Sequence, residues 1–339
     1  MSDPTVSAAY AKALVDLAVA KGADRDALLD HAGLTYAAFD DSHRRIPFDQ
    51  FKTLMRQGKL LSGEPALGLY FGATISFDQL SLVGLITRAA PTMKQAFAEL
   101  NRYGRLIIEV EGIGTEDRFQ IVRRDGRLWI DDIRTNPNSF PELTESTLGR
   151  FICAFKRFFP DSHYYLSAQV THSAPDYAPL YEKLIGVPVT FDCAHNAMEI
   201  DKSLLSLRLN PKNNYVFGML SEQAAILLAK LEAMKTVRAE IERRLMPILH
   251  TGQVELEMVA EDMGMNRQKL YRALRAEGVR YKDVLDDLRR RLALDYLGGG
   301  KVSVNEAAYL VGFSDPSAFS RAFKRWTGES PGRFAAAVN

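Results

Sequence analysis

The chain has 339 residues, of which 47% are hydrophobic and 25% are charged, and its formal net charge is only +1. These values are ordinary for a globular protein, and the length favours two domains over one. No apolar run reaches the roughly 18 residues that span a bilayer, and the first residues lack the order of a signal peptide. We therefore expect a cytoplasmic protein with no membrane contact, and free, buried thiols at Cys153 and Cys193.

The first 215 residues mix helical and strand periodicity, which predicts an α+β domain. Within 118–135, Asp125-Gly126 separates two alternating runs and predicts a hairpin with a type I′ turn. In chain order, the patterns predict helices at 6–22, 24–34, 46–63 and 91–104, strands at 105–112, 118–135 and 163–172, a helix at 175–186 and two short strands within 187–201.

After a turn-rich break at 210–214, nearly every segment has helical periodicity, so the second half is predicted to be all α. From residue 236 to the end there are 17 Lys and Arg against 14 Asp and Glu, a net charge of +3. This excess alone does not indicate nucleic-acid binding. The predicted helices span 217–234, 237–250, 254–263, 266–277, 281–297, 303–311 and 316–327.

The stretch GFSDPSAFSRAFKRWTGESP, residues 312–331, carries strong helix signals. Asp315 suits an N-cap, Pro316 the first helical position and Gly328 the C-terminal end, which predicts a helix at 316–327. At helical spacing its aromatic residues share one face, and its serines and basic residues occupy the others. Taken alone, this pattern is typical of an amphipathic helix with a solvated charged face.

A related pattern occurs about 48 residues earlier, at 256–278. Ala260 precedes Gly264 by four residues, as Ala308 precedes Gly312, and each pair leads through a polar turn into a basic amphipathic helix. A small residue at a helix crossing and a glycine at the turn are features of a helix-turn-helix. A connecting helix at 281–297, roughly 25 Å long, can place two such units about one turn of B-DNA apart, about 34 Å.

The same motifs carry a family resemblance. They are Ala260, Gly264, Leu270, Arg272, Leu274 and Gly278 in the first unit, and 311–317, Phe319, 320–324 and 328–331 in the second. Through them, residues from about 236 to 336 resemble the AraC-type DNA-binding domain. The segments 84–97, 177–191 and the chain from Asn196 onward resemble, more loosely, the effector domain called arabinose-binding-like. The resemblance implies an effector and dimerisation domain at 1–215, an inter-domain helix at 216–235 and a double helix-turn-helix domain at 236–339.

The resemblance and the helical geometry together assign the DNA contacts. In the first recognition helix, Gln268, Tyr271 and Arg272 are expected to face bases, and Arg267 and Lys269 to face phosphates. In the second, Ser317, Ser320 and Arg321 are the matching set, and Lys324 and Arg325 are expected to face the backbone. Serines are permissive base readers, so the second unit is expected to supply affinity more than sequence choice. The alternative for Arg272 and Arg321 is a salt bridge to a neighbouring helix.

The first half lacks a phosphate loop, a nucleophile elbow and an HExxH motif, so we expect no enzyme. Cys193-x-His195 is only a fragment of metal-ligand spacing, and we expect neither a metal nor a cofactor. Arg123, Arg124 and Arg127 surround the tip of the predicted hairpin and can hold an anionic effector, although a solvated hairpin tip is the simpler interpretation.

The sequence therefore predicts a transcription regulator whose first domain senses a small molecule. Its predicted partners are operator or promoter DNA, a small-molecule effector, RNA polymerase by family resemblance and a second copy of the chain. Two alternatives stay open. The first domain can merely oligomerise, without an effector, or it can be an enzyme with a nucleophilic cysteine attached to a DNA-binding domain.

Overall fold

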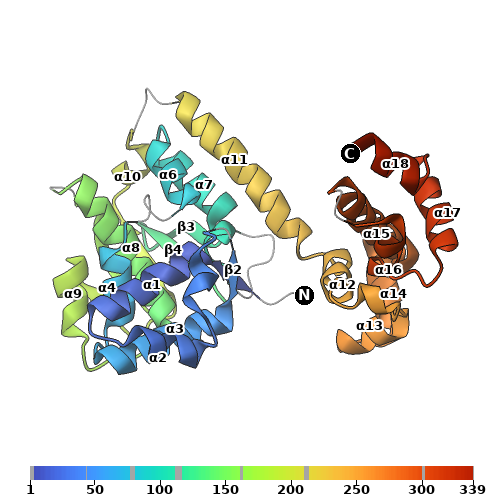
Figure 1. Cartoon of the computed structure of the whole chain (residues 1–339). Helices are drawn as coiled ribbons and strands as arrows, with labels where there is room; N and C mark the ends of the chain where they lie inside the picture. The colour runs from blue at the N-terminus through green and yellow to red at the C-terminus, as the bar shows by residue number, and fades with distance from the viewer. Residues whose placement is uncertain are drawn as a thin grey trace. The chain divides into compact units, whose positions relative to one another are not determined.

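The computed structural model describes residues 4–42, 44–76, 81–110, 117–160, 163–209, 214–299 and 302–338, and its helices and strands are labelled in Figure 1. The chain divides into two compact units, Met1–Ala229 and Lys230–Asn339. The first unit combines helices with two sheets, and the described part of the second is built from helices. An α+β domain followed by an all-α domain is thus confirmed. The predicted break at 210–214 lies almost wholly outside the described residues.

The described helices of the first unit are α1 (Ala8–Ala20), α2 (Arg25–Ala32), α3 (Phe48–Ser62), α4 (Leu67–Thr74), α6 (Leu82–Ala89), α7 (Met93–Tyr103), α8 (Pro141–Phe158), α9 (Pro179–Ile185), α10 (Ser203–Ser206) and α11 (Asn214–Ala233), which continues into the second unit. The strands are β1 (Thr5–Ser7), β2 (Arg45–Pro47), β3 (Phe119–Arg124), β4 (Arg127–Asp132), β5 (Tyr165–Gln169), β6 (Val189–Thr190) and β7 (Ala197–Ile200).

The five-stranded sheet has the order β3-β4-β7-β5-β6. At the β3–β4 turn, Asp125 and Gly126 have φ values of 49° and 77°, as the predicted type I′ turn requires. Arg124 and Arg127, which flank the turn, lie opposite each other in the β3–β4 ladder. The strands β6 and β7 are both present within 187–201. They are not neighbours, because β5 lies between them, parallel to β6 and antiparallel to β7.

Helix α8 is a central element that the sequence patterns did not predict. It packs closely on α4, where a Cβ added to Gly72 would lie 2.3 Å from the carbonyl oxygen of Ser146. The first half of α8 buries polar residues rather than an apolar stripe, including Thr144 and Thr147. The hydrophobic spacing that identifies most helices is therefore weak in this half and begins only with Leu148, Ile152 and Phe155.

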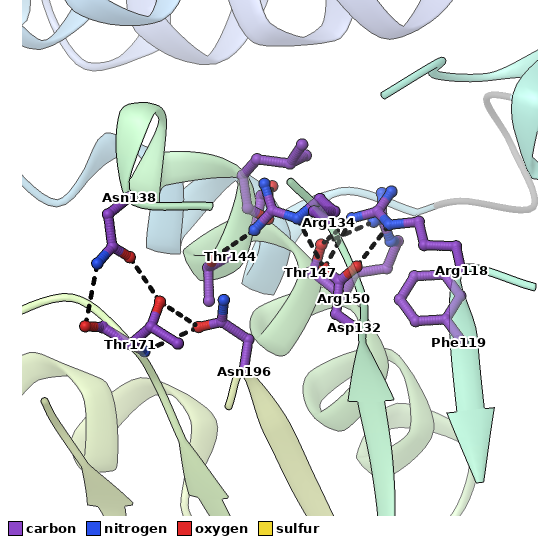
Figure 2. Close-up of polar contacts among 12 residues, drawn as sticks. Arg118, Phe119, Asp132, Arg134, Asn138, Thr144, Thr147, Arg150, Thr171 and Asn196 are labelled. Carbon is purple, nitrogen blue, oxygen red and sulfur yellow. Dashed lines mark hydrogen bonds and ion pairs between the residues drawn. The ribbon is translucent and has the colours of Figure 1, made fainter. Parts of the chain in front are cut away.

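Those threonines belong to a buried polar network between α8 and β4 (Figure 2). Arg118 donates to both carboxylate oxygens of Asp132, at 2.7 and 2.8 Å, and to Thr147 at 3.2 Å. Arg134 also pairs with Asp132 and donates to Thr144. Burial disfavours the charged form of Asp132, but the two guanidinium groups hold the pKa of this carboxyl below its ordinary value.

The predicted strand at 105–112 is wrong over its described part. Gly104–Leu106 form a 3₁₀ turn, and Ile108 makes an isolated bridge to Val6. Glu109 is buried and accepts a hydrogen bond from the Thr5 hydroxyl at 2.8 Å. The segment thus lies alongside β1, with hydrogen bonds from Ser7 N–H to the Ile107 carbonyl and from Glu109 N–H to the Thr5 carbonyl, instead of joining the main sheet.

The described helices of the second unit are α12 (Val237–Leu245), α13 (Leu256–Asp262), α14 (Arg267–Ala276), α15 (Tyr281–Gly298), α16 (Val304–Leu310), α17 (Pro316–Thr327) and α18 (Pro331–Val338). The helix predicted at 237–250 ends earlier, before Pro247, and a 3₁₀ turn follows at Leu249–Thr251. A single apolar cluster joins these helices, with Leu245, Leu274, Leu288 and Phe323 among its buried members.

Charged side chains fasten α12 to α15 at the surface of this unit. Arg238 contacts Glu242 at 2.9 Å and also pairs with Asp287, and Arg291 pairs with Glu242. Such partly exposed ion pairs contribute up to about 1 kcal/mol each. The apolar cluster therefore provides most of the cohesion, and the ion pairs set the register of the two helices.

Candidate nucleic-acid interface

Helices α13 and α14 form the first helix-turn-helix. The side chain of Asn266 caps α14 by accepting a hydrogen bond from the backbone N–H of Lys269 at 2.8 Å. Leu270 and Leu274 are buried and attach the helix to the unit. The turn between the helices contains Gly264 at φ 64°. These contacts leave the opposite face of α14 in solvent.

All five residues predicted to contact DNA from the first helix-turn-helix are exposed on α14, namely Arg267, Gln268, Lys269, Tyr271 and Arg272. Arg267 pairs with Glu257 at 2.8 Å across the turn. The side chains of Gln268, Tyr271 and Arg272 make no hydrogen bond or ion pair with any residue that the structure describes. Among those residues, the predicted alternative of a salt bridge from Arg272 to a neighbouring helix is therefore not observed.

Helices α16 and α17 form the second helix-turn-helix, and α17 spans the predicted residues. Its N-cap Asp315 accepts hydrogen bonds from the backbone N–H groups of Ser317 at 2.9 Å and Ala318 at 3.1 Å. These bonds stabilise the carboxylate and lower the pKa of Asp315. The helix ends at Gly328, where φ is 88°.

An aromatic cluster attaches α17 to its unit. Phe319 and Phe323 are completely buried. The ring of Phe313, from the turn, lies 5.7 Å from that of Phe319 and 6.0 Å from that of Trp326. Phe323 contacts Phe334 of α18 at 5.7 Å. These rings are the apolar face that the spacing predicted.

The polar face of α17 is less uniform than predicted. Ser317, Lys324 and Arg321 are exposed, whereas Ser320 is half-buried. Arg321 lies 3.9 Å from the carboxylate of Asp315 in its own helix. Within the described residues, no partner contacts the side chain of Lys324.

Arg325 also lies on this face, and its position was only partly predictable. Its guanidinium pairs with Asp286 of α15 at 3.2 Å. An arginine expected to face the DNA backbone therefore also holds α17 to the connecting helix.

The turn of the second helix-turn-helix is held by a residue that the sequence analysis did not single out. Arg289 of α15 donates to the carbonyl oxygens of Val311 at 3.1 Å and Gly312 at 3.3 Å, and its guanidinium stacks on Phe313. Burial lowers the pKa of Arg289 from its ordinary value. No local signal marks this role, because the partners are backbone carbonyls more than 20 residues away.

The hairpin arginines lie in the first compact unit of the chain, Met1–Ala229. Arg124 and Arg127 are direct cross-strand partners, whereas Arg123 lies opposite Leu128 and so points to the other face of the sheet. Arg124 pairs with Asp131 at 2.6 Å. Arg124 and Arg127 line a hollow of about 540 Å³ with Trp129, Gln169, Cys193 and His195. The structure thus brings two of the three arginines together, and each already has a carboxylate partner, Asp131 for Arg124 and Glu199 for Arg127.

The described cysteines are free and half-buried. Burial raises the pKa of the Cys153 thiol, whereas a nucleophilic cysteine needs a lowered one. Within the described ranges, no group of three or more His, Cys, Asp or Glu side chains is placed to hold a metal ion. A search of the same residues finds no helix with the length and apolar character needed to span a membrane.

Two helix-turn-helix units that follow a separate α+β domain in the chain define a DNA-binding transcription regulator. Residues 22–209 match the family described as the arabinose-binding domain of AraC transcription regulator, N-terminal, and residues 259–337 match a helix-turn-helix domain. The chain belongs to the AraC family of transcription regulators. Its domains and relatives are those of regulators and not of enzymes.

The chain is similar to known regulators along most of its length. It is 27% identical to the ornithine utilization regulator of Pseudomonas aeruginosa over 328 residues, which are 96% of this chain and 95% of that protein. It is 37% identical to the regulator VirS of Mycobacterium tuberculosis over 94 residues, 28% of this chain and 27% of that protein. Among solved structures, the regulator CdpR from P. aeruginosa covers 92% of this chain and is itself covered over 96%, at 18% identity and a TM-score of 0.40.

Proposed function

We propose that α14 reads the base sequence of an operator, and that α17 contributes mainly affinity through the DNA backbone. The observation that carries this proposal is the set of three adjacent side chains on α14, Gln268, Tyr271 and Arg272, which are exposed and have no partner among the described residues. An arginine can bond bidentately to guanine and a glutamine to adenine. On α17, the half-buried Ser320 and the paired Arg325 leave fewer groups for bases.

We further propose that the two recognition helices enter successive major grooves on one face of the DNA. The connecting helix α15 has 18 residues and is about 27 Å long at 1.5 Å per residue. With the helices at its ends, this length is compatible with the spacing of about 34 Å between successive grooves. One chain then covers two neighbouring turns of the duplex.

We infer that the regulator acts as a homodimer and that α11 contributes to the dimer contact. Tyr215, Met219 and Ile226 are exposed by 79, 49 and 45%, and their spacing of four and seven residues places them along one stripe. Such a stripe on a 20-residue helix is suited to pairing with its own copy. Promoter DNA, RNA polymerase, a small-molecule effector and a cytoplasmic, nucleoid-associated location complete the proposal.

The base-reading role of α14 is tested on the full-length protein with an operator selected in vitro from random DNA. Arg272→Ala should lose about 1–3 kcal/mol of discrimination between the selected site and a scrambled duplex, as measured by fluorescence anisotropy. Arg243→Ala removes an exposed arginine of α12, outside both helix-turn-helix units, and serves as the control. Equal discrimination by the two variants would refute the role of Arg272.

A further inference from the structure

The first unit contains a second hollow, larger in its apolar surface than the one at the hairpin. Its volume is about 550 Å³, and α6, α7, α8 and β5 contribute to its walls. Its apolar lining includes Met93, Phe97, Leu100, Phe151, Phe155 and Phe159. On α8 the lining residues run from Arg150 to Phe158, so the hollow follows this helix for about two turns, roughly 12 Å. A hollow of this size and composition is typical of a small-molecule site.

The charged residues of this lining are all of one sign. Among the described residues the lining contains Arg88, Arg150 and Arg157 and no carboxylate. Arg157 donates to the carbonyl oxygens of Thr74 at 3.3 Å and Ile75 at 3.0 Å, which leaves its positive charge uncompensated by an acidic side chain of the described chain. An apolar site that includes such an arginine favours an anionic ligand.

Two of these arginines lie at the same end of the hollow. The guanidinium carbon of Arg88 is 5.2 Å from the ring centroid of Phe158, the residue that follows Arg157 on α8. Both Arg88 and Arg157 are exposed, so they border the hollow where it meets solvent. Arg150 lies two turns away and donates to the hydroxyl of Tyr10 at 3.2 Å.

The phenol of Tyr165 adds a hydrogen-bond donor to the hollow. Tyr165 of β5 lines the hollow and is only 6% exposed, and its hydroxyl has no hydrogen-bond partner within the part of the chain that the structure describes. Although most of its ring is buried, its oxygen is not one of the buried, unbonded side-chain atoms of the described chain, so solvent reaches it. Burial raises the pKa of Tyr165, so the group remains a donor at neutral pH. An acceptor inside the hollow would satisfy it.

We propose that this hollow binds an apolar monocarboxylate, with its carboxylate at Arg88 and Arg157 and its hydrocarbon body along the phenylalanines of α7 and α8. The hairpin hollow is a weaker candidate for an anion, because Arg124 and Arg127 are each paired with a carboxylate, whereas the described partners of Arg157 are backbone carbonyls. This inference deepens the effector-sensing part of the proposed function.

The walls of the hollow also contact the helix that leads to the second unit. Helix α6 lines the hollow with Gly84 and Thr87, and it buries Val83 and Ile86 in the same apolar cluster as Ala224 of α11. The Ser221 hydroxyl of α11 donates to Glu99 of α7 at 3.3 Å. A ligand that displaces α7 therefore changes the hydrogen bond between Glu99 and Ser221 of α11.

The test measures binding of octanoate and 4-phenylbutyrate to the full-length protein by isothermal titration calorimetry, with 1-octanol as the uncharged probe. We expect the double variant Arg88→Gln/Arg157→Gln to weaken carboxylate binding at least tenfold and to leave 1-octanol unaffected. Ala154→Phe, which fills the hollow, should abolish binding of all three probes. Lys94→Gln removes an exposed charge of α7 outside the lining and is the matched control.

Absence of binding by both carboxylates would overturn the proposal. So would carboxylate binding that the arginine double variant leaves unchanged, or binding that is lost in Arg127→Gln at the hairpin instead. Because both mutated arginines are exposed, this double variant keeps the test valid even if Ala154→Phe does not fold. Operator affinity is measured separately with and without octanoate. Carboxylate binding that leaves operator affinity unchanged would support the site and contradict its role in sensing.

Discussion

The two helix-turn-helix units share one plan but differ in how their recognition helices are held. In the first, α14 is attached by Leu270 and Leu274, and its turn glycine, Gly264, has open space around it. In the second, α17 is attached by an aromatic cluster and by an arginine from α15 that binds the turn. The second helix-turn-helix, whose recognition helix has more contacts with its surroundings, has fewer unpaired side chains on its polar face.

This difference suggests a division of labour between affinity and sequence choice. Arg325 of α17 bonds to α15, and Arg321 lies near its own N-cap, whereas Arg272 of α14 has no partner among the described residues. A guanidinium already paired within the protein loses part of that interaction when it turns to a base. We therefore expect the first helix-turn-helix to discriminate better between bases.

The largest expected effect separates the two turn glycines. A Cβ at Gly312 would lie 2.1 Å from the carbonyl oxygen of Leu249, and φ at Gly312 is 79°. Gly312→Ala should therefore lower the free energy of unfolding of the helical domain, through its second helix-turn-helix, by about 4 kcal/mol. Gly264→Ala adds only backbone strain, about 1–2 kcal/mol. In a Trp129→Phe background, Trp326 is the only tryptophan and its fluorescence follows urea unfolding of this unit. Equal losses for the two glycines would contradict the comparison.

A smaller effect is expected from the two side chains by which α15 holds the two helix-turn-helix units. Arg289→Met keeps an unbranched stem but removes the guanidinium group and its two charge-assisted hydrogen bonds to the second turn, at a cost of about 2 kcal/mol. Tyr281→Phe removes one neutral bond, from its hydroxyl to Val254 ahead of α13, at a cost of about 1 kcal/mol. The same fluorescence measurement ranks them. A larger loss of unfolding free energy from Tyr281→Phe would show that α15 holds the first helix-turn-helix more firmly than the second.

The smallest effect concerns two basic residues of α17. Lys324→Ala should reduce the salt dependence of operator binding by about one phosphate contact, and should weaken specific and scrambled DNA alike. Arg325→Ala should change that slope less, because Arg325 is paired with Asp286. Anisotropy titrations between about 50 and 200 mM salt measure both slopes. A larger slope change for Arg325→Ala would mean that its ion pair opens on DNA.

Prediction from sequence succeeded where the signals are local. The helix at 316–327 was predicted to the residue, because Asp315, Pro316 and Gly328 act within one turn of its ends. The hairpin turn at Asp125-Gly126 was likewise confirmed, since two positive φ values favour such a pair. In each case the interacting groups are neighbours in the chain.

Helix α8 shows where the same approach fails. The buried face of its first half consists largely of acidic and hydroxyl residues, whose partners Arg118, Arg134 and the backbone of α4 lie far away in the sequence. The apolar stripe of Leu148, Ile152 and Phe155 begins only in the second half, so the periodic signal is weak where the helix starts. The strand predicted at 105–112 failed for a related reason, because a distant ribbon satisfies Glu109.

For the interface, the sequence by itself determined which side chains lie on the exposed faces of α14 and α17, because helical spacing separates them from the leucines and aromatics that must be buried. Only the tertiary structure decided which of those side chains are unpaired, that Arg289 holds the second turn, and that three arginines border one apolar hollow. Those features depend on contacts between residues distant in the chain, and the order of residues along one segment does not encode them.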